Sequence, residues 1–247
     1  MVRVIAHRGA SRARRENTVE AFEFAAELGA DGIELDVRLT LDGALIVHHD
    51  ARVDGVGAIA SLERDALPGH VPTLTDALDA CGELFVNVEI KNSARSKFYD
   101  ADMVMVRDVQ RELRRRCHSD DELGLRYSVS SFDPATVTAS RAADPALPTA
   151  LLFDRGDPTR ILRRCAAQGH AAAHPVDLLV DEVFVAQAAE LELEVNVWTV
   201  DDPDRMAELV RLGVDGIITN VPDVARVAVT AATADGPTKG PMGGPEQ

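Results

Sequence analysis

Residues 32–49 read GIELDVRLTLDGALIVHH, and this stretch contains the pattern that decides the fold. The β-rich run at 32–38 predicts a strand, and a second apolar run follows at 45–49. A Leu-Asp-Gly turn at 41–43 separates the two runs, and Asp-Gly between apolar runs is a strong hairpin signal. We therefore expect a strand at 32–38 that carries a short β-hairpin.

Seven further β-rich runs alternate with helical stretches on either side of this hairpin. Strands are expected at 3–8, 84–91, 123–130, 149–153, 171–174, 194–200 and 216–219. Helices are expected near 18–28, 74–82, 99–117, 134–142, 157–168, 181–191, 203–212 and 223–231. Eight β–α units in 247 residues predict an α/β fold, namely a single (β/α)8 TIM barrel with the extra hairpin after its second strand. An open doubly wound sheet is disfavoured, because the sequence has neither G-x-G-x-x-G nor a P-loop.

The domain organisation follows from composition. We expect the barrel to occupy residues 1–232, and the Gly/Pro-rich segment 233–247 to be a disordered tail. At the first helix, Asn17 and Glu20 have the spacing of a capping box, which predicts Asn17 as the N-cap.

The charge balance excludes several classes of partner. The chain has 26 Lys and Arg against 41 Asp and Glu, a formal charge of −15, so binding to nucleic acid or stable association with an anionic membrane is not expected. The three cysteines are far apart and form no C-x-x-C pair, which argues against disulfides and a thiolate zinc site. With no signal-peptide core and no apolar stretch of about 20 residues, we expect a cytoplasmic protein. Its oligomeric state is not indicated by the sequence.

Polar residues gather where the predicted strands end, which is where barrel enzymes place their active sites. Glu34 and Asp36 lie two apart on one strand and so face the same side, and Glu89 ends the next strand of the barrel. Three carboxylates at one barrel mouth would repel one another unless a cation lay between them. Oxygen ligands select Mg²⁺, Ca²⁺ or Mn²⁺ over zinc. Salt bridges between rim carboxylates and Arg or Lys are an equally good explanation of these residues taken alone.

The remaining candidates are two histidines, two cations and the single tryptophan. His7 and His49 could form an acid–base pair, since imidazole exchanges protons near neutral pH. Arg8 and Lys91 supply the positive charge that a phosphate ester needs, although salt bridges to the same carboxylates would also explain them. Trp198 is either a platform for a ligand or part of the core.

Nine short motifs together resemble the glycerophosphodiester phosphodiesterase family, which has a phosphatidylinositol-phospholipase-like TIM barrel. They span roughly residues 3–225 in the family's order. The motifs are HRG (7–9), ENT (16–18), E-x-D (34–36), T-x-D-G running into H-D (40–50), VPTL (71–74), EIK (89–91), SSF (130–132), WTV (198–200) and GIITN (216–220).

The resemblance implies an activity and a set of roles. It implies a phosphoric diester hydrolase that converts soluble glycerophosphodiesters, such as glycerophosphocholine and glycerophosphoethanolamine, to sn-glycerol 3-phosphate and an alcohol. The implied roles are catalytic His7 and His49, substrate-binding Arg8, Lys91 and Trp198, and Glu34, Asp36 and Glu89 as ligands of one divalent cation, Mg²⁺ or Ca²⁺, with Mn²⁺ as a third option. Alternatives are a lysophospholipase D-like or sphingomyelinase D-like enzyme, a barrel that binds a phosphate ligand without turnover, and an unrelated aldolase or isomerase.

Two departures from the family pattern stand out. Arg15 replaces the proline that precedes ENT in the family, which loosens the loop without removing any of the proposed chemistry. The segment between His49 and Glu89 is short and lacks most of the insertion that covers the site in many members. Because that segment contacts the alcohol part of the substrate, a more open mouth could admit larger headgroups or lysophospholipids.

Overall fold

Eight parallel strands form a closed barrel in the computed structural model, which describes residues 2–234. Neighbouring strands follow one another in chain order, and β1 pairs with both β2 and β11 to close the ring. The barrel strands are β1 (Arg3–His7), β2 (Gly32–Leu39), β6 (Phe85–Ile90), β7 (Tyr127–Ser131), β8 (Thr149–Phe153), β9 (Ala172–Pro175), β10 (Glu194–Val197) and β11 (Gly216–Thr219). The predicted (β/α)8 barrel is thus confirmed.

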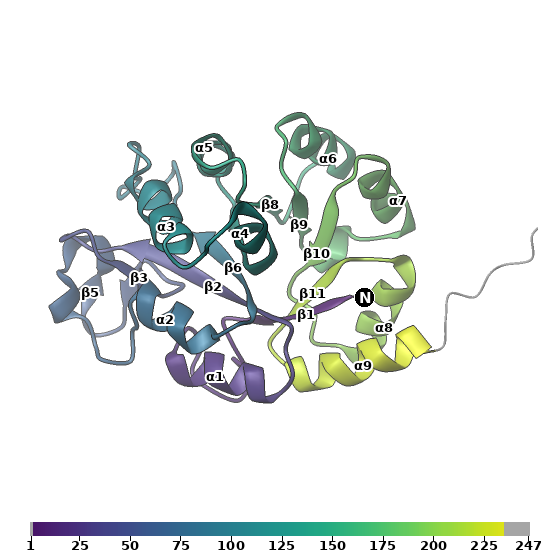
Figure 1. Cartoon of the computed structure of the whole chain (residues 1–247), viewed down its shortest axis with the longest axis horizontal. Helices are drawn as coiled ribbons and strands as arrows, with labels where there is room; N and C mark the ends of the chain where they lie inside the picture. Colours follow the sequence, from purple (N-terminus) through teal and green to yellow (C-terminus); the bar gives the residue numbers. More distant parts are fainter. Residues whose placement is uncertain (1, 235–247) are drawn as a thin grey trace, which may run out of the picture.

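Helices surround the strands (Figure 1). They are α1 (Val19–Glu27), α2 (Leu74–Cys81), α3 (Val104–Arg114), α4 (Asp120–Arg126), α5 (Pro134–Ala143), α6 (Pro158–Ala167), α7 (Glu182–Glu190), α8 (Pro203–Leu212) and α9 (Pro222–Ala234). Helices α5, α6 and α8 begin in the same way, with an aspartate whose carboxylate accepts a main-chain N–H and a proline in the first turn. Proline is tolerated there because its missing N–H would have had no partner within the helix.

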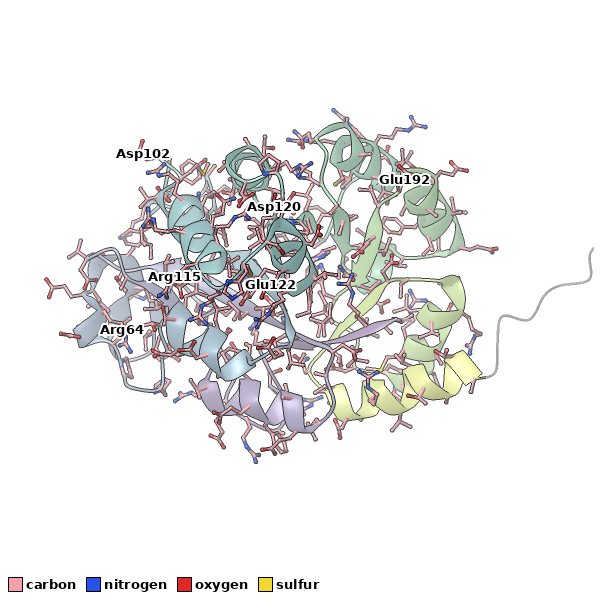
Figure 2. All side chains as sticks on the ribbon, in the orientation of Figure 1. Arg64, Asp102, Arg115, Asp120, Glu122 and Glu192 are labelled. Atoms are coloured by element: carbon pink, nitrogen blue, oxygen red, sulfur yellow. The ribbon has the colours of Figure 1, made fainter. Side chains whose placement is uncertain are left out.

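Apolar side chains pack between the barrel and its helices in two large clusters. One cluster centres on β2, β6 and β7 with α1 to α3, and the other on β8 to β11 with α6 to α9. Charged residues such as Asp102, Arg115 and Glu192 are exposed on the outside (Figure 2). The excess of acidic side chains is therefore largely exposed to solvent, whereas the barrel buries only a few carboxylates.

The predicted hairpin after the second strand is present. Strand β3 (Leu45–Val47) runs antiparallel to β2, with Val47 opposite Val37. Beyond it come the short strands β4 (Arg52–Val53) and β5 (Gly57–Ala58) and the 3-10 turns η1 (Ile59–Ser61) and η2 (Arg64–Ala66). A small apolar core of Ile46, Val53, Ile59, Leu67 and Val71 holds this segment beside the barrel.

Some predicted boundaries are wrong. Residues 123–126, predicted to start a strand, belong to α4, because the Ser119 hydroxyl caps that helix at Glu122 N and acidic residues fill its first turn. The helix predicted from 99 begins at Val104, and the strand predicted over 194–200 ends at Val197.

The predicted boundary at 232 falls inside α9, which continues to Ala234. The rest of the predicted tail lies outside the described residues, so its disorder stays a prediction. Among the described helices, none has the length and hydrophobicity that crossing a membrane would require.

Candidate active site

Three buried carboxylates meet at the carboxyl end of the barrel. Glu34 and Asp36 project from the same face of β2, and Glu89 comes from β6, where it is the register partner of Asp36. One carboxylate oxygen from each residue lies within 4.8 Å of the others. The structure thus brings together the three acids that the sequence analysis selected.

Two cations lie against this triad. Lys91 Nζ is 2.9 Å from Asp36 Oδ1 and 2.6 Å from Glu89 Oε1. Arg8 Nε is 3.2 Å from Asp36 Oδ2, and its terminal nitrogen bonds Glu16 at 3.0 Å. Three carboxylates thus face only two cations, and one of these, Arg8, also pairs with Glu16. The triad is therefore left with more negative than positive charge.

The protonation of the three acids reflects this imbalance. Burial opposes ionisation of Asp36, yet Lys91 and Arg8 bring its pKa down to about 2. Burial raises the pKa of Glu89 to about 7 despite the neighbouring Lys91. Burial and the charges of Asp36 and Glu89 raise the pKa of Glu34 well above its usual value. Full ionisation of all three therefore requires more positive charge than Lys91 and Arg8 provide.

A divalent cation fits this environment. The Oε1 atom of Glu34 is buried and has no hydrogen-bond partner among the described residues. Its Oε2 atom accepts the main-chain N–H of Arg8 at 3.1 Å. Orphaned buried carboxylate oxygens are costly unless a cation or donor satisfies them. An all-oxygen donor set of Glu34, Asp36 and Glu89 suits Mg²⁺, Ca²⁺ or Mn²⁺.

The loop after β1 brings His7 and Arg8 to the triad. Gly9 has φ +81°, and a Cβ at that position would lie 2.7 Å from the main chain of Ala21 on α1. Only glycine fits both this left-handed conformation and this close approach. The chain can then turn so that the Arg8 amide also donates to the Glu34 main-chain oxygen at 2.9 Å.

His7 is oriented by residues at the far end of the chain. Its Nδ1 lies 2.8 Å from Asn220 Oδ1, and Asn220 Nδ2 donates to Asp201 Oδ2 at 2.8 Å. A carboxylate can only accept, so the Asn220 amide must direct its oxygen toward His7, and Nδ1 must be the protonated ring nitrogen. The Nε2 atom, 3.9 Å from Glu34, is then free to accept a proton. Burial and the charge of Arg8 lower the pKa of His7 below 6.5.

His49 follows β3 and lies in the electrostatic field of the triad. Its Nδ1 is 2.8 Å from Asp50 Oδ1, and its main-chain oxygen accepts a 2.8 Å hydrogen bond from Arg38 Nε. Burial and the charge of Lys91 lower the pKa of His49, while Asp36 acts in the opposite direction. Pairing of Nδ1 with a carboxylate again leaves Nε2 available, as in His7.

Asn17 was assigned the wrong role by the sequence analysis. Thr18 is the N-cap of α1 and accepts from Ala21 N, whereas Asn17 is buried with φ +55°. The Asn17 amide donates to Asp36 Oδ2 at 2.7 Å and accepts from the Asp36 main chain at 3.3 Å. The one feature of the sequence that pointed to a role in the site is the position of Asn17 in the ENT motif. Asn17 therefore helps to fix the central carboxylate of the triad.

Trp198 lies just beyond the end of β10, although the strand was predicted to extend to residue 200. The Trp198 indole donates to the main-chain oxygen of His174 at 2.8 Å. Its ring meets that of Phe132 edge to face, with 5.4 Å between the centroids, and Phe132 lies 5.9 Å from Lys91 Nζ. Trp198 is thus linked to the triad through Phe132, and a direct role in substrate binding stays a prediction.

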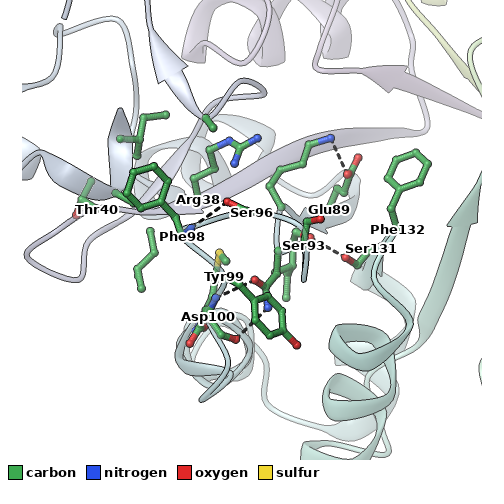
Figure 3. A pocket seen from close by; sticks show the side chains of 18 of the residues that line it. Arg38, Thr40, Glu89, Ser93, Ser96, Phe98, Tyr99, Asp100, Ser131 and Phe132 are labelled. Atoms are coloured by element: carbon green, nitrogen blue, oxygen red, sulfur yellow. Dashed lines mark hydrogen bonds and ion pairs between the residues drawn. The ribbon is translucent and has the colours of Figure 1, made fainter. Parts of the chain in front are cut away.

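Two cavities lie near the candidate site, and one of them reaches the triad. The larger one, of about 540 Å³, includes Glu89, Lys91 and Phe132 in its lining (Figure 3). A smaller polar cavity of about 240 Å³ is lined in part by His49 and Asn17. The larger cavity therefore opens onto Glu89, whereas the smaller one contacts the site through His49 and Asn17.

Comparisons with known proteins agree with this geometry. Residues 7–224 match the Glycerophosphoryl diester phosphodiesterase family. A glycerophosphodiester phosphodiesterase of Caldanaerobacter subterraneus subsp. tengcongensis is 31% identical over 242 residues, which cover 89% of this chain and 94% of the relative.

Solved structures are similar in fold. The crystal structure of a Parabacteroides distasonis glycerophosphodiester phosphodiesterase has a TM-score of 0.80 and 25% identity and covers 94% of this chain and 98% of its own. An Oleispira antarctica phosphodiesterase, solved with the product sn-glycerol-3-phosphate, has a TM-score of 0.83 and 21% identity and covers 92% and 96%. This chain therefore belongs to the glycerophosphoryl diester phosphodiesterase family and is a phosphoric diester hydrolase.

Proposed function

We propose that the protein is a metal-dependent enzyme that hydrolyses glycerophosphodiesters, such as glycerophosphocholine and glycerophosphoethanolamine, to sn-glycerol 3-phosphate and the free alcohol. The observation that carries this proposal is a buried carboxylate triad with too little positive charge beside it, with His7 Nε2 3.9 Å from Glu34 and His49 in the electrostatic field of Asp36. Each imidazole has Nδ1 engaged and Nε2 available. The Oleispira antarctica relative, which was solved with sn-glycerol-3-phosphate, supports the choice of product.

Glu34, Asp36 and Glu89 would hold the cation, which supplies Lewis-acid polarisation of the phosphoryl group when bound. Arg8 and Lys91 both contact Asp36 of the triad, and their side-chain nitrogens would bind phosphate oxygens in charge-assisted hydrogen bonds. Their positive charge also stabilises the negative charge that develops on the phosphate in the transition state.

The two histidines divide the proton transfers. One imidazole accepts a proton at Nε2 from the nucleophile, which is either water or a hydroxyl of the substrate's own glycerol, and the other donates a proton to the oxygen of the departing alcohol. With the glycerol hydroxyl as nucleophile, water would then open the cyclic phosphate formed first to give sn-glycerol 3-phosphate. The lowered pKa of both histidines keeps them mainly neutral at pH 7, which favours the base form. The partner that acts as an acid must gain its proton near the phosphate, where the substrate's negative charge favours the imidazolium.

A direct test is to follow glycerophosphocholine, glycerophosphoethanolamine and a phosphomonoester by phosphorus NMR in the presence of Mg²⁺, Ca²⁺ or Mn²⁺. We expect sn-glycerol 3-phosphate from both diesters and no reaction of the monoester. Hydrolysis of the monoester alone would contradict the proposal. Binding of glycerophosphocholine without any product, under every metal, would favour a barrel that binds phosphate ligands without turnover.

A further inference from the structure

The smaller cavity adjoins the place where the proposed proton transfers occur. It has a volume of about 240 Å³, and its lining includes His49 and Asn17. Asn17 in turn donates to Asp36 of the triad at 2.7 Å. Within the described part of the chain, neither Arg8 nor Lys91 belongs to the lining. A group in this cavity would therefore lie beside the phosphate site without sharing its cations.

Two arginines of this cavity have no acidic partner. Arg15 comes from the loop after β1, and Arg52 comes from β4. Among residues 2–234, which the structure describes, neither guanidinium forms an ion pair. Both side chains are exposed, so they are accessible to a ligand that enters the cavity.

Two of the three acids in the lining are already engaged. Both carboxylate oxygens of Glu16 accept hydrogen bonds of 3.0 Å from Arg8, and Asp50 Oδ1 lies 2.8 Å from His49 Nδ1. The third acid is Asp54, on the turn between β4 and β5. One carboxylate therefore faces two guanidiniums, and the cavity has an excess of positive charge.

Two further imidazoles line the same cavity. They belong to His48, which directly follows β3, and to His70, which precedes α2. Burial lowers the pKa of His70, and the charges of Arg15 and His48 lower it further. The His70 ring thus lies in the positive field of Arg15. An imidazole donates at least one N–H in either protonation state, so both rings suit an anionic ligand.

The fold holds both arginines at the cavity. The Thr18 hydroxyl, which caps α1, donates to the main-chain oxygen of Arg15 at 2.7 Å. Arg52 is the register partner of Ala58 in the β4–β5 sheet, and the adjacent Val53 packs in the small apolar core of this segment. The main chain of each arginine is therefore anchored next to the barrel.

Both arginines occur where the sequence departs from the family pattern. Arg15 replaces the proline that precedes ENT, and Arg52 lies in the short segment between His49 and Glu89. The structure brings these two departures together at one cavity. Their common effect is to add positive charge beside His49.

We propose that this cavity binds an anionic group, a carboxylate or a phosphate, on the alcohol part of the substrate, with Arg15 and Arg52 as specificity-determining residues. The inference rests on the proposed phosphodiesterase function and names the substrates that the enzyme prefers. The glycerol part of a glycerophosphodiester carries no charge, so only the alcohol part can supply the anion. A choline group in the same cavity would meet two guanidiniums.

The test compares kcat/KM at low ionic strength for substrates that differ by one anionic group. Glycerophosphoserine has one carboxylate more than glycerophosphoethanolamine, and glycerophosphoinositol 4-phosphate has one phosphate more than glycerophosphoinositol. We expect the acidic member of at least one pair to have a kcat/KM about three- to tenfold higher, because bonds from exposed arginines are charge-assisted but partly screened. The pair with the larger advantage identifies the anionic group.

Salt dependence gives a second reading of the same comparison. The advantage should shrink at about 1 M salt, where the Debye length is about 3 Å. Equal values within both pairs at low ionic strength, or higher values for the neutral members, would overturn the proposal.

Variants of the two arginines locate the effect. Arg15→Gln and Arg52→Gln should each reduce the acidic-to-neutral ratio of kcat/KM about two- to threefold, and Arg15→Glu/Arg52→Glu should bring it below one. Arg163→Gln is the matched control, because Arg163 is an exposed arginine on α6 outside the cavity. An unchanged ratio in the double variant, or an equal reduction in Arg163→Gln, would overturn the proposal.

A binding measurement separates this proposal from the proposed function. Phosphoserine and phosphoethanolamine form one pair of ligands, and inositol 1,4-bisphosphate and inositol 1-phosphate form the other. Each is titrated calorimetrically, with Mg²⁺ present, into the wild type and Arg15→Glu/Arg52→Glu. Tighter binding of an acidic member to the wild type only would support the anion site even if no diester were hydrolysed. Equal affinities within both pairs would overturn it even if glycerophosphocholine were turned over.

Discussion

The Nδ1 atom of His7 lies 2.8 Å from the side-chain oxygen of Asn220, a residue 213 positions later in the chain. His7 ends β1 and Asn220 follows β11, so the contact forms where the last strand closes the barrel on the first. Asp201, which comes after β10, holds Asn220 through two hydrogen bonds of 2.8 Å, one from the Asn220 main-chain N–H to Oδ1 and one from its side-chain amide to Oδ2. The orientation of His7 therefore depends on barrel closure.

Replacement of Asn220 should affect His7 without removing it. In Asn220→Ala, Nδ1 of His7 loses the acceptor that selects its tautomer, so we expect kcat to fall about tenfold to a hundredfold with little change in KM. Ser11→Ala serves as the control, because Ser11 donates to the same oxygen at 2.8 Å but does not orient the amide. Steady-state kinetics with glycerophosphocholine would show whether kcat falls while KM stays nearly constant. A wild-type kcat in Asn220→Ala would contradict the positioning role.

Loss of either imidazole should remove acid–base catalysis. His7→Ala and His49→Ala are each expected to lower kcat about 10²- to 10⁴-fold while far-UV circular dichroism stays unchanged. The matched control is His118→Ala, since His118 is exposed on the outside of the barrel between α3 and α4. A rate near that of the wild type in either active-site variant at neutral pH would refute the assignment of that histidine.

Glu34 should matter chiefly for the metal. Glu34→Gln removes one anionic ligand from the triad, so the metal concentration for half-maximal activity should rise about tenfold or more. A readout independent of turnover is the melting temperature, which Mg²⁺ or Ca²⁺ should raise in the wild type by binding only the folded state. That rise should be smaller in Glu34→Gln and unchanged in the exposed control Glu27→Gln. Equal metal responses in all three proteins would contradict the proposed ligand.

His174 should couple stability to pH. It is fully buried inside the barrel, where its Nε2 accepts from Asn196 at 2.9 Å, and burial lowers its pKa to about 3. In the unfolded chain the pKa returns to about 6.5, so between pH 6.5 and 3 the unfolded state binds more protons. Stability should therefore fall with decreasing pH, by at most about 1.4 kcal/mol per unit from this group.

Urea unfolding at pH 7, 6 and 5 would test this dependence. His174→Gln should lose less stability on acidification than the wild type, whereas the exposed variant His118→Gln should behave like the wild type. Parallel pH dependences for His174→Gln and the wild type would show that the buried imidazole is not the source.

The barrel was predictable because its signal is repeated. Eight apolar runs alternate with helical stretches, and each run is buried on both faces, so small boundary errors do not alter the topology. The start of the β7 strand was mispredicted because Leu123 and Leu125 resemble strand residues, while the cap at Ser119 makes them helical. Local capping chemistry thus overrode the apolar pattern.

The candidate site was only partly predictable. Glu34 and Asp36 are two residues apart on one strand, so their position on the same face could be predicted. The order of the strands predicted that Glu89 lies beside them. The contacts of Asn17 and Asn220 were not predicted, because they depend on loop geometry and on which strand ends meet when the barrel closes. The larger cavity beside the triad was not predicted either, since its walls come from segments that lie far apart in the sequence.

The most direct measurement of the central claim is release of sn-glycerol 3-phosphate from glycerophosphocholine by chelator-treated protein, with Mg²⁺, Ca²⁺ or Mn²⁺ added back singly and with His49→Ala as the control. We predict no product after chelation, restored product with at least one of these ions, and none from His49→Ala under the same conditions. Undiminished product after complete metal removal, or product from His49→Ala at the wild-type rate, would contradict a metal-assisted reaction with His49 as a proton-transfer group.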